Sequence, residues 1–172
     1  MPLVEKSVSK RPSIWRHWSL HTKFSSGASA ANFSLDTIKA FCDEIGTPQS
    51  SFPSIHVAGT NGKGSVCAIL EAIYREAGYI TGVFTSPHLE TYNERFRING
   101  DVIEDRVILE FFKKTAPKIV EFNLSYFEIS TALAFWVFAR SEVDIAIIET
   151  GLGGRLDATN IITPQLSIIS SI

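Results

Sequence analysis

Cysteine is scarce in this sequence of 172 residues, and its scarcity excludes a fold held together by disulfide bonds. Cys42 and Cys67 are the two cysteines, and neither belongs to a CxxC pattern. Both lie in segments with the apolar spacing of a helix, so they are predicted to be buried thiols in a reducing compartment. Neither cysteine indicates a metal site.

Long hydrophobic runs are also missing. No apolar stretch reaches the length of a secretory signal or a membrane helix, so we expect a cytoplasmic protein without membrane contact. The formal net charge of −2 gives no general electrostatic reason to expect nucleic acid as a partner. Residues 1–35 are locally basic, which we interpret as a solvated face. A basic, serine-containing N-terminus is also typical of a transit peptide, and this alternative stays open.

Strand-like and helical patterns alternate along the chain, without repeats or low-complexity tracts. Apolar strands are predicted at 54–58, 79–85, 144–150 and 165–172, and Asn99-Gly100 is typical of a tight hairpin turn. The run 144–150 is apolar without interruption, as expected when both faces of a parallel sheet are covered. This order predicts an α/β fold, a three-layer P-loop type with a mainly parallel sheet.

Helices are predicted over four segments. The first is indicated by the apolar spacing of Leu35, Ile38, Phe41 and Ile45 before Gly46, and the second by Val66, Ile69, Leu70 and Ile73 on one face of 63–77. The third is predicted over 106–122 with a local break at Pro117. The fourth is predicted over 126–139, behind a capping box of Ser125 and Glu128. Ile14, Trp15 and Trp18 suit a further short helix, and the small polar residues of 25–34 indicate a mobile loop. Residues 1–35 are therefore set apart from 36–172 as an N-terminal extension.

A glycine-rich loop, "GTNGKGS", follows the first strand. Phosphate needs several donors at once, and successive glycines let the backbone N–H groups of Thr60 to Gly64 converge on it. Lys63 adds a positive charge, and the helix that begins there directs its positive dipole end at the same anion. The loop departs from the strict G-x-x-x-x-G-K-[ST] pattern, because Gly64 separates Lys63 from Ser65.

A second loop, "ETGLGGRLDATN", begins with Glu149 at the end of the buried strand 144–150. A carboxylate that faces a phosphate loop is well placed to bind Mg²⁺, which prefers oxygen ligands. Arg155 and Asp157 in this loop fit either a structural ion pair or a contact with ligand. The residue types alone do not separate the two.

The loop between these two, "TSPHLETYNER", contains Ser86 before Pro87, a bond that can be cis. We assign His88 a structural or loop-positioning role, because no serine or cysteine arrangement supports a catalytic triad. Phe127, at a predicted helix start, offers an aromatic stacking surface. Glu128 is interpreted as a helix cap.

Four segments in this order, "HVAGTNGKGS", "TSPHLETYNERFRING", "YFEISTALAF" and "ETGLGGRLDATN", resemble the N-terminal part of bacterial folylpolyglutamate synthase/dihydrofolate synthase, within the Mur ligase superfamily. The resemblance runs from about Ile14 to Ile172, and the family shares the inserted Gly64. It implies an ATP-dependent ligase that joins L-glutamate to dihydropteroate or to folates through an acyl phosphate. It also implies that 36–172 is the N-terminal part of an ATP-binding domain in a longer, monomeric enzyme, and that this chain alone is inactive.

The resemblance implies roles for individual residues. Lys63 and Glu149 are implied to be catalytic, with Ser86 and Glu149 as Mg²⁺ ligands; the ATP loop is matched by Thr60, Asn61, Gly62, Lys63, Gly64 and Ser65; and the pterin pocket is matched by Phe127, Asp157 and Ala158. The segment "FSLDT", 33–37, departs from the family's usual pterin-contacting sequence. Two alternatives remain: a nucleotide- or pterin-binding module without turnover, and a related ligase acting on cell-wall precursors.

Overall fold

The computed structural model describes residues 34–172. The helix predicted around Trp15 and nearly all of the loop predicted at 25–34 lie outside the described residues. Within the described part of the chain, no helix is long and apolar enough to cross a membrane.

A six-stranded sheet forms the centre of the fold, in the order β4-β3-β2-β5-β1-β6. The strands are β1 (Ser54–Ala58), β2 (Thr81–Phe84), β3 (Phe96–Ile98), β4 (Asp101–Val102), β5 (Ile145–Glu149) and β6 (Leu166–Ile169). The four strands β2, β5, β1 and β6 are parallel, whereas β3 and β4 are antiparallel to their neighbours. The mainly parallel sheet predicted from the alternating pattern is confirmed.

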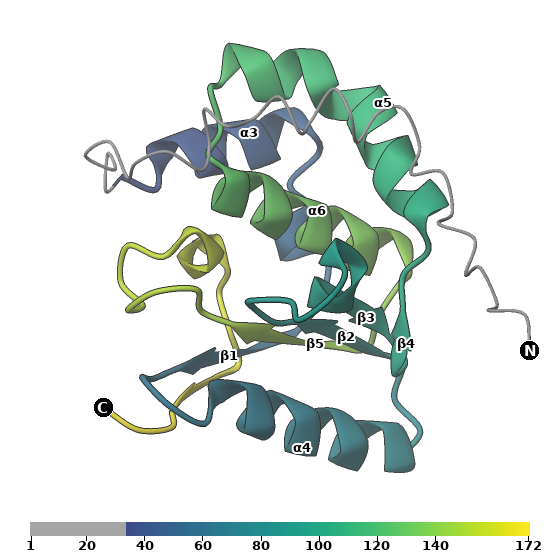
Figure 1. The fold of residues 1–172 in the computed structure, drawn as a ribbon, viewed down its shortest axis with the longest axis vertical. Helices are drawn as coiled ribbons and strands as arrows, with labels where there is room; N and C mark the ends of the chain where they lie inside the picture. The colour runs from purple at the N-terminus through teal and green to yellow at the C-terminus, as the bar shows by residue number, and fades with distance from the viewer. Residues whose placement is uncertain (1–33) are drawn as a thin grey trace, which may run out of the picture. The chain divides into compact units, whose positions relative to one another are not determined.

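Helices cover both faces of this sheet and complete the three predicted layers. Figure 1 shows α4 (Lys63–Glu76) on one face and α6 (Tyr126–Arg140) on the other, with α3 (Asp36–Glu44) and α5 (Asp105–Glu121) beyond α6. Short 3₁₀ turns, η1 (Pro48–Ser50), η2 (Tyr92–Arg95) and η3 (Ala158–Ile161), connect these elements.

The core has two halves, one on each side of the sheet. Side chains of Ile55, Val57, Val83 and Ile147 pack with Cys67 of α4. On the other face, Phe138 of α6 lies so close to Gly82 that a Cβ at that glycine would stand 2.7 Å from its ring. A larger residue at position 82 would therefore push α6 away from the sheet.

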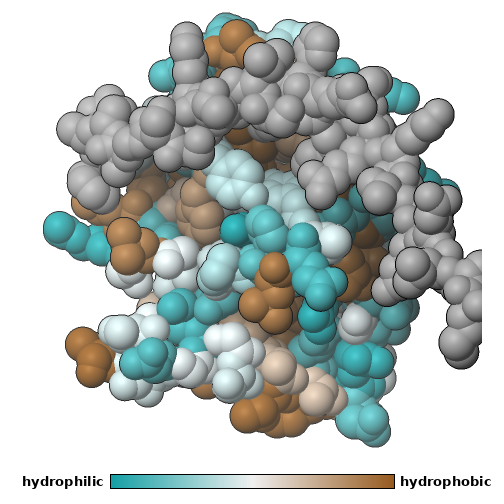
Figure 2. All heavy atoms as spheres, in the orientation of Figure 1, coloured by the Kyte–Doolittle hydropathy of each residue, from teal (hydrophilic) through white to brown (hydrophobic). Residues whose placement is uncertain are grey.

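The apolar face predicted for α4 is partly wrong. Ile69 and Ile73 are 60% and 58% exposed, whereas Cys67 and Glu71 are the buried residues of this helix. The face that meets the sheet is rotated from the predicted one, with Leu70 and Tyr74 packed beside Cys67. Figure 2 shows the resulting hydrophobic surface over α4, at the lower edge of the molecule.

The break predicted at Pro117 is also wrong, because α5 is continuous from Asp105 to Glu121. Proline removes one backbone hydrogen bond and crowds the preceding turn. Buried side chains on both sides of it, including Thr115 and Ile119, anchor the helix against its neighbours. Tertiary packing outweighs the local cost here.

Other local predictions are confirmed. The side chain of Ser125 accepts from the Glu128 N–H while Glu128 accepts from the Ser125 N–H, which is the predicted capping box of α6. Asn99 and Gly100 have φ angles of 51° and 90°, as a tight hairpin turn requires. Cys42 and Cys67 are buried free thiols, and burial raises the pKa of each to about 12.

Candidate active site

The three loops singled out in the sequence leave the carboxyl ends of three parallel strands that are neighbours in the sheet. β5 lies between β1 and β2, so Glu149 at its end stands between the glycine-rich loop and the Ser86 loop. Ligands of open α/β sheets bind at this edge. The topology therefore brings the predicted phosphate and metal residues together.

The glycine-rich loop depends on two positive φ angles. Gly59 has a φ of 135° and Gly62 a φ of 82°, a region that residues with a Cβ rarely adopt. Gly62 caps α4, so the N–H groups of Lys63, Gly64 and Ser65 form the first turn of that helix, where no carbonyl of the helix can accept from them. A helix start of this kind favours an anion.

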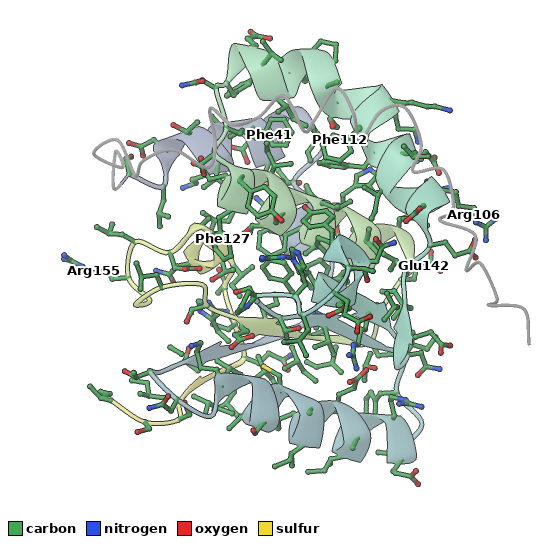
Figure 3. The ribbon with its side chains drawn as sticks, viewed as in Figure 1. Phe41, Arg106, Phe112, Phe127, Glu142 and Arg155 are labelled. Carbon is green, nitrogen blue, oxygen red and sulfur yellow. The ribbon has the colours of Figure 1, made fainter. Side chains whose placement is uncertain are left out.

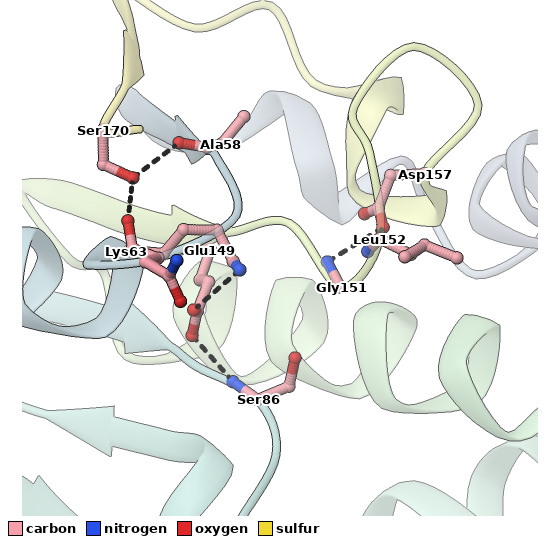
Figure 4. A network of polar contacts seen from close by, with 9 residues as sticks. Ala58, Lys63, Ser86, Glu149, Gly151, Leu152, Asp157 and Ser170 are labelled. Atoms are coloured by element: carbon pink, nitrogen blue, oxygen red, sulfur yellow. Dashed lines mark hydrogen bonds and ion pairs between the residues drawn. The ribbon is translucent and has the colours of Figure 1, made fainter. Parts of the chain in front are cut away.

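One of the N–H groups predicted to bind phosphate is bonded to another part of the chain. The Thr60 N–H donates to the Ser171 carbonyl at 2.6 Å, so its predicted convergence on phosphate is not seen. The Ser170 hydroxyl lies 2.7 Å from the Asn61 carbonyl and 3.2 Å from the Ala58 carbonyl (Figure 4). Residues just after β6 thus hold the loop in place, which the sequence pattern did not reveal.

We expect Gly59→Ala to lower the free energy of unfolding by about 1–3 kcal/mol. A Cβ at Gly59 would stand 2.3 Å from the Ser170 Oγ and 2.9 Å from the Ser171 carbonyl oxygen, on a backbone that already disfavours it. Gly64→Ala is the matched control, because a Cβ there meets nothing within 4 Å. Urea denaturation of both variants checks this, and equal stabilities would contradict the strain assigned to Gly59.

Lys63, Glu149 and Ser86 form the polar centre of the edge (Figure 4). The Lys63 Nζ lies 3.8 Å from the Glu149 Oε1, and the Glu149 Oε2 accepts from the Ser86 N–H at 2.9 Å. Glu149 is 5% exposed. Burial raises the pKa of its carboxyl, while the Ser86 N–H and the charges of Lys63 and Arg95 act in the opposite direction.

Glu149 and Ser86 offer oxygen donors for a metal. Within 34–172 no cluster of three or more His, Cys, Asp and Glu side chains is arranged to hold an ion. One carboxylate and one hydroxyl nevertheless suit Mg²⁺, which commonly takes one or two carboxylates and completes its shell with waters and substrate phosphates. The Glu149 and Ser86 oxygens fit that ion.

Asp157 organises its own loop. Its Oδ2 accepts from the N–H groups of Gly151 and Leu152 at 2.9 and 2.8 Å, and its Oδ1 accepts from the N–H and hydroxyl of Thr159. These four donors occupy about all the acceptor positions of a carboxylate. The alternative of an ion pair with Arg155 is wrong: Figure 3 shows Arg155 directed outward, and the described residues include no such pair.

His56 extends this network to the centre of the sheet. Because the Thr159 hydroxyl donates to Asp157, the His56 Nε2 donates to the Thr159 oxygen at 2.7 Å. Burial lowers the pKa of His56, against the opposing charge of Asp157. Sequence reasoning missed this role, although a histidine in the middle of a buried strand was a signal for it.

Phe127 lies on the first turn of α6 and points toward the Glu149 loop (Figure 3). Its ring would lie 2.4 Å from a Cβ at Gly151, and its centroid is 5.9 Å from that of Phe84. Phe127 is half-buried and Ala158 is buried. Phe127 thus sits above the ends of β5 and β2, whereas the pterin contacts implied for Phe127, Asp157 and Ala158 stay predictions.

The Ser86 loop is held by Glu94. Its carboxylate accepts from the N–H groups of Leu89, Glu90 and Thr91 at 2.6–3.0 Å, and the Ser86-Pro87 peptide is cis. These backbone donors lower the pKa of Glu94 to about 2. His88 accepts from Arg95 through its Nδ1, which agrees with the positioning role predicted for it.

We expect Glu94→Gln to destabilise the protein near neutral pH and to matter less in acid. A folded-state pKa below 4.5 means that the carboxylate stabilises the fold above that pH and loses this contribution as the pH falls toward about 2. Unfolding measured at about pH 7 and about pH 2.5 checks the change, with the exposed neighbour Glu90→Gln as control. A wild-type advantage that stays constant across this range would contradict it.

Comparisons with known proteins agree with this geometry. No protein-family model matches the chain. It is 41% identical over 145 residues to a dihydrofolate synthase/folylpolyglutamate synthase of Bacillus subtilis, covering 80% of this chain and 34% of that protein. The Mycobacterium tuberculosis relative of the same description is 39% identical over 152 residues, covering 81% and 31%.

Solved structures give the same result. Folylpolyglutamate synthase from Thermotoga maritima matches with a TM-score of 0.82 and 35% identity, over 92% of this chain and 38% of that one. The Mycobacterium tuberculosis enzyme complexed with ADP matches with a TM-score of 0.83 and 36% identity, over 91% and 36%. Escherichia coli FolC in complex with DHPP and ADP matches with 0.81 and 35%, over 90% and 38%.

The sheet, the glycine-rich loop and the buried acid beside it define a P-loop-containing α/β domain of the Mur ligase type. The chain belongs to the dihydrofolate synthase/folylpolyglutamate synthase family. It spans about a third of the length of the Bacillus subtilis and Mycobacterium tuberculosis relatives.

Proposed function

We propose that this chain supplies the nucleotide-binding and pteridine-binding part of an ATP-dependent ligase. The ligase adds L-glutamate to dihydropteroate, to folates, or to both. The observation that carries the proposal is the meeting of Lys63, Glu149 and Ser86 beside a glycine-rich helix start. The relatives' ADP and DHPP complexes support the two ligand classes.

The proposed reaction has two steps. The terminal phosphoryl group of ATP passes to an oxygen of the substrate carboxylate, which releases ADP and leaves an acyl phosphate. The amine of L-glutamate then attacks the acyl carbon, and phosphate leaves as the amide forms. Carboxylates are poor electrophiles at neutral pH, so the first step needs strong neutralisation of charge on the phosphoryl group.

The residues of this chain meet that need in distinct ways. Lys63 and the first N–H groups of α4 bind the nucleotide phosphates, and Glu149 with Ser86 would hold Mg²⁺ through their oxygens. When bound, Mg²⁺ supplies further positive charge to the phosphate oxygens. Phe127 offers its ring to the pterin, while Asp157 keeps the turn after Glu149 in one conformation by accepting from its N–H groups.

We further propose that residues 36–172 form the first part of the ATP-binding domain, after an extension of residues 1–35. The glutamate site would then lie in the part of the relatives that this chain does not span. Consequently the 172-residue chain is expected to bind both ligands and to form no measurable dihydrofolate. This outcome separates binding from ligation.

Equilibrium titration tests the proposal. We expect the chain to bind ADP with Mg²⁺ and, separately, dihydropteroate. A muramyl peptide serves as the competing ligand from cell-wall chemistry and is expected not to bind. Preference for the muramyl peptide, or no binding of ADP, would overturn the assignment.

A further inference from the structure

Arg95 is a buried cation at the same edge of the sheet, and its charge acts on Glu149 from beyond ion-pair distance. It is 7% exposed, and its Nε donates to the His88 Nδ1 at 2.9 Å. Its guanidinium carbon lies 5.9 Å from the ring centroid of Tyr92 and 5.4 Å from that of Tyr126. Arginine stays charged in such surroundings, and aromatic faces tolerate it well.

Arg95 forms no ion pair with an acidic side chain in the part of the chain that the structure describes. The ion pairs found there involve other basic residues, and none joins a carboxylate to Arg95. A buried charge without an opposite charge is costly, so folded proteins rarely keep one without a use. A histidine nitrogen and two tyrosine side chains hold the guanidinium in place, and Glu149, the carboxylate on which its charge acts, lies beyond ion-pair distance.

The position of Arg95 in the sheet indicates which anion it meets. Its carbonyl accepts from the Thr85 N–H, next to Ser86, and Phe96 pairs with Phe84 in the β2–β3 ladder. Along this edge the order is therefore the phosphate loop after β1, Glu149 after β5, Ser86 after β2, and Arg95 before β3. In the order of the sheet, Arg95 lies three strands from the phosphate loop. Neighbouring strands are about 4.8 Å apart.

Phosphoryl transfer places the donor and the acceptor roughly in line, on opposite sides of the transferred group. Lys63 lies on the donor side of Glu149 and Ser86, and Arg95 lies on the opposite side of them. The first turn of α6 brings Tyr126, against Arg95, next to Phe127 in the chain. The aromatic platform proposed for the pterin and the positive charge of Arg95 thus belong to one region of the site.

We propose that Arg95 binds the carboxylate of the pteridine substrate, the group that is to be phosphorylated. The guanidinium fork matches a carboxylate with two parallel N–H···O bonds, and His88 sets its orientation by accepting from Nε. The inference rests on the proposed function, because it needs a carboxylate substrate on the acceptor side. It makes Arg95 a substrate-binding residue and His88 a positioning residue.

The test compares two ligands and three proteins. Dihydropteroate and its carboxamide, in which the acid is replaced by a neutral amide, are titrated into the wild-type chain, Arg95→Gln and Arg97→Gln. We expect the wild type to bind the acid about 10- to 100-fold more tightly than the amide, and Arg95→Gln to lose that preference. Arg97→Gln removes an equal charge two residues away, and this variant is expected to keep the preference for the acid.

The outcomes separate this inference from the function on which it rests. If the wild type binds neither ADP nor dihydropteroate, the proposed function fails. If the wild type binds both ADP and dihydropteroate but binds the acid and the amide with equal affinity, the function stands and the role of Arg95 is overturned. This result does not depend on whether the variant folds. A loss of ADP affinity in Arg95→Gln without a loss of acid preference would assign Arg95 to phosphate instead, and would also overturn it.

Discussion

Replacing Lys63 by alanine is expected to weaken ADP binding to this chain about 10- to 100-fold. The ammonium group is the single cation within ion-pair distance of Glu149 in the described part of the chain, at 3.8 Å. Its removal deletes a charge-assisted contact to phosphate and leaves the buried Glu149 carboxylate facing the same anion without that cation. In a complete enzyme the same change should abolish ligation.

Lys39→Ala is the control for this variant, because Lys39 is an exposed lysine on α3. Isothermal titration with ADP in the presence of Mg²⁺ measures both. Wild-type affinity in Lys63→Ala would mean that the glycine-rich loop is a structural turn and not a phosphate site. Equal losses in both variants would indicate a general effect of net charge.

The sequence predicted those parts of the fold that depend on short stretches of chain. The apolar run that becomes β5, the tight turn at Asn99-Gly100 and the capping box of α6 each carry their own signal, and each is confirmed. The meeting of Lys63 with Glu149 also followed from the sequence. Parallel strands place their carboxyl ends at one edge, so residues far apart in the chain converge there.

What the sequence could not predict depends on contacts between distant elements. The rotation of α4 on the sheet decides that Ile73 is exposed while Glu71 is buried, and no periodicity separates these choices. Pro117 is tolerated because buried residues anchor α5 around it. The donors that surround Asp157 come from its own loop, but only the folded loop shows that they fill its acceptor positions.

Arg95 illustrates the same limit at the site. In the sequence it is one of two arginines in a segment that alternates with apolar residues, a pattern typical of a strand with a solvated face. The structure separates the two, since Arg95 is 7% exposed and Arg97 is half-buried. A buried cation that forms no ion pair is recognised only when all surrounding elements are in place.

The effect of Glu149→Gln on ADP affinity is expected to change sign when Mg²⁺ is added. Without Mg²⁺ the carboxylate repels phosphate and competes for Lys63, so the variant should bind ADP at least as tightly as the wild type. With Mg²⁺ the Glu149 carboxylate of the wild type is a ligand for the ion, and the amide of the variant replaces this ligand poorly. The Mg²⁺ concentration that gives half of the maximal change in ADP affinity should then be at least about tenfold higher in the variant.

This reversal distinguishes a metal ligand from a residue that only supports the fold. Structural damage would weaken ADP binding at every Mg²⁺ concentration, whereas loss of a ligand weakens it only where the ion contributes. The exposed Glu76→Gln on α4 removes one negative charge from the same helix and should follow the wild-type curve. An unchanged Mg²⁺ titration in Glu149→Gln would remove Glu149 from the metal site, and Ser86 alone would be too poor a donor set for the ion.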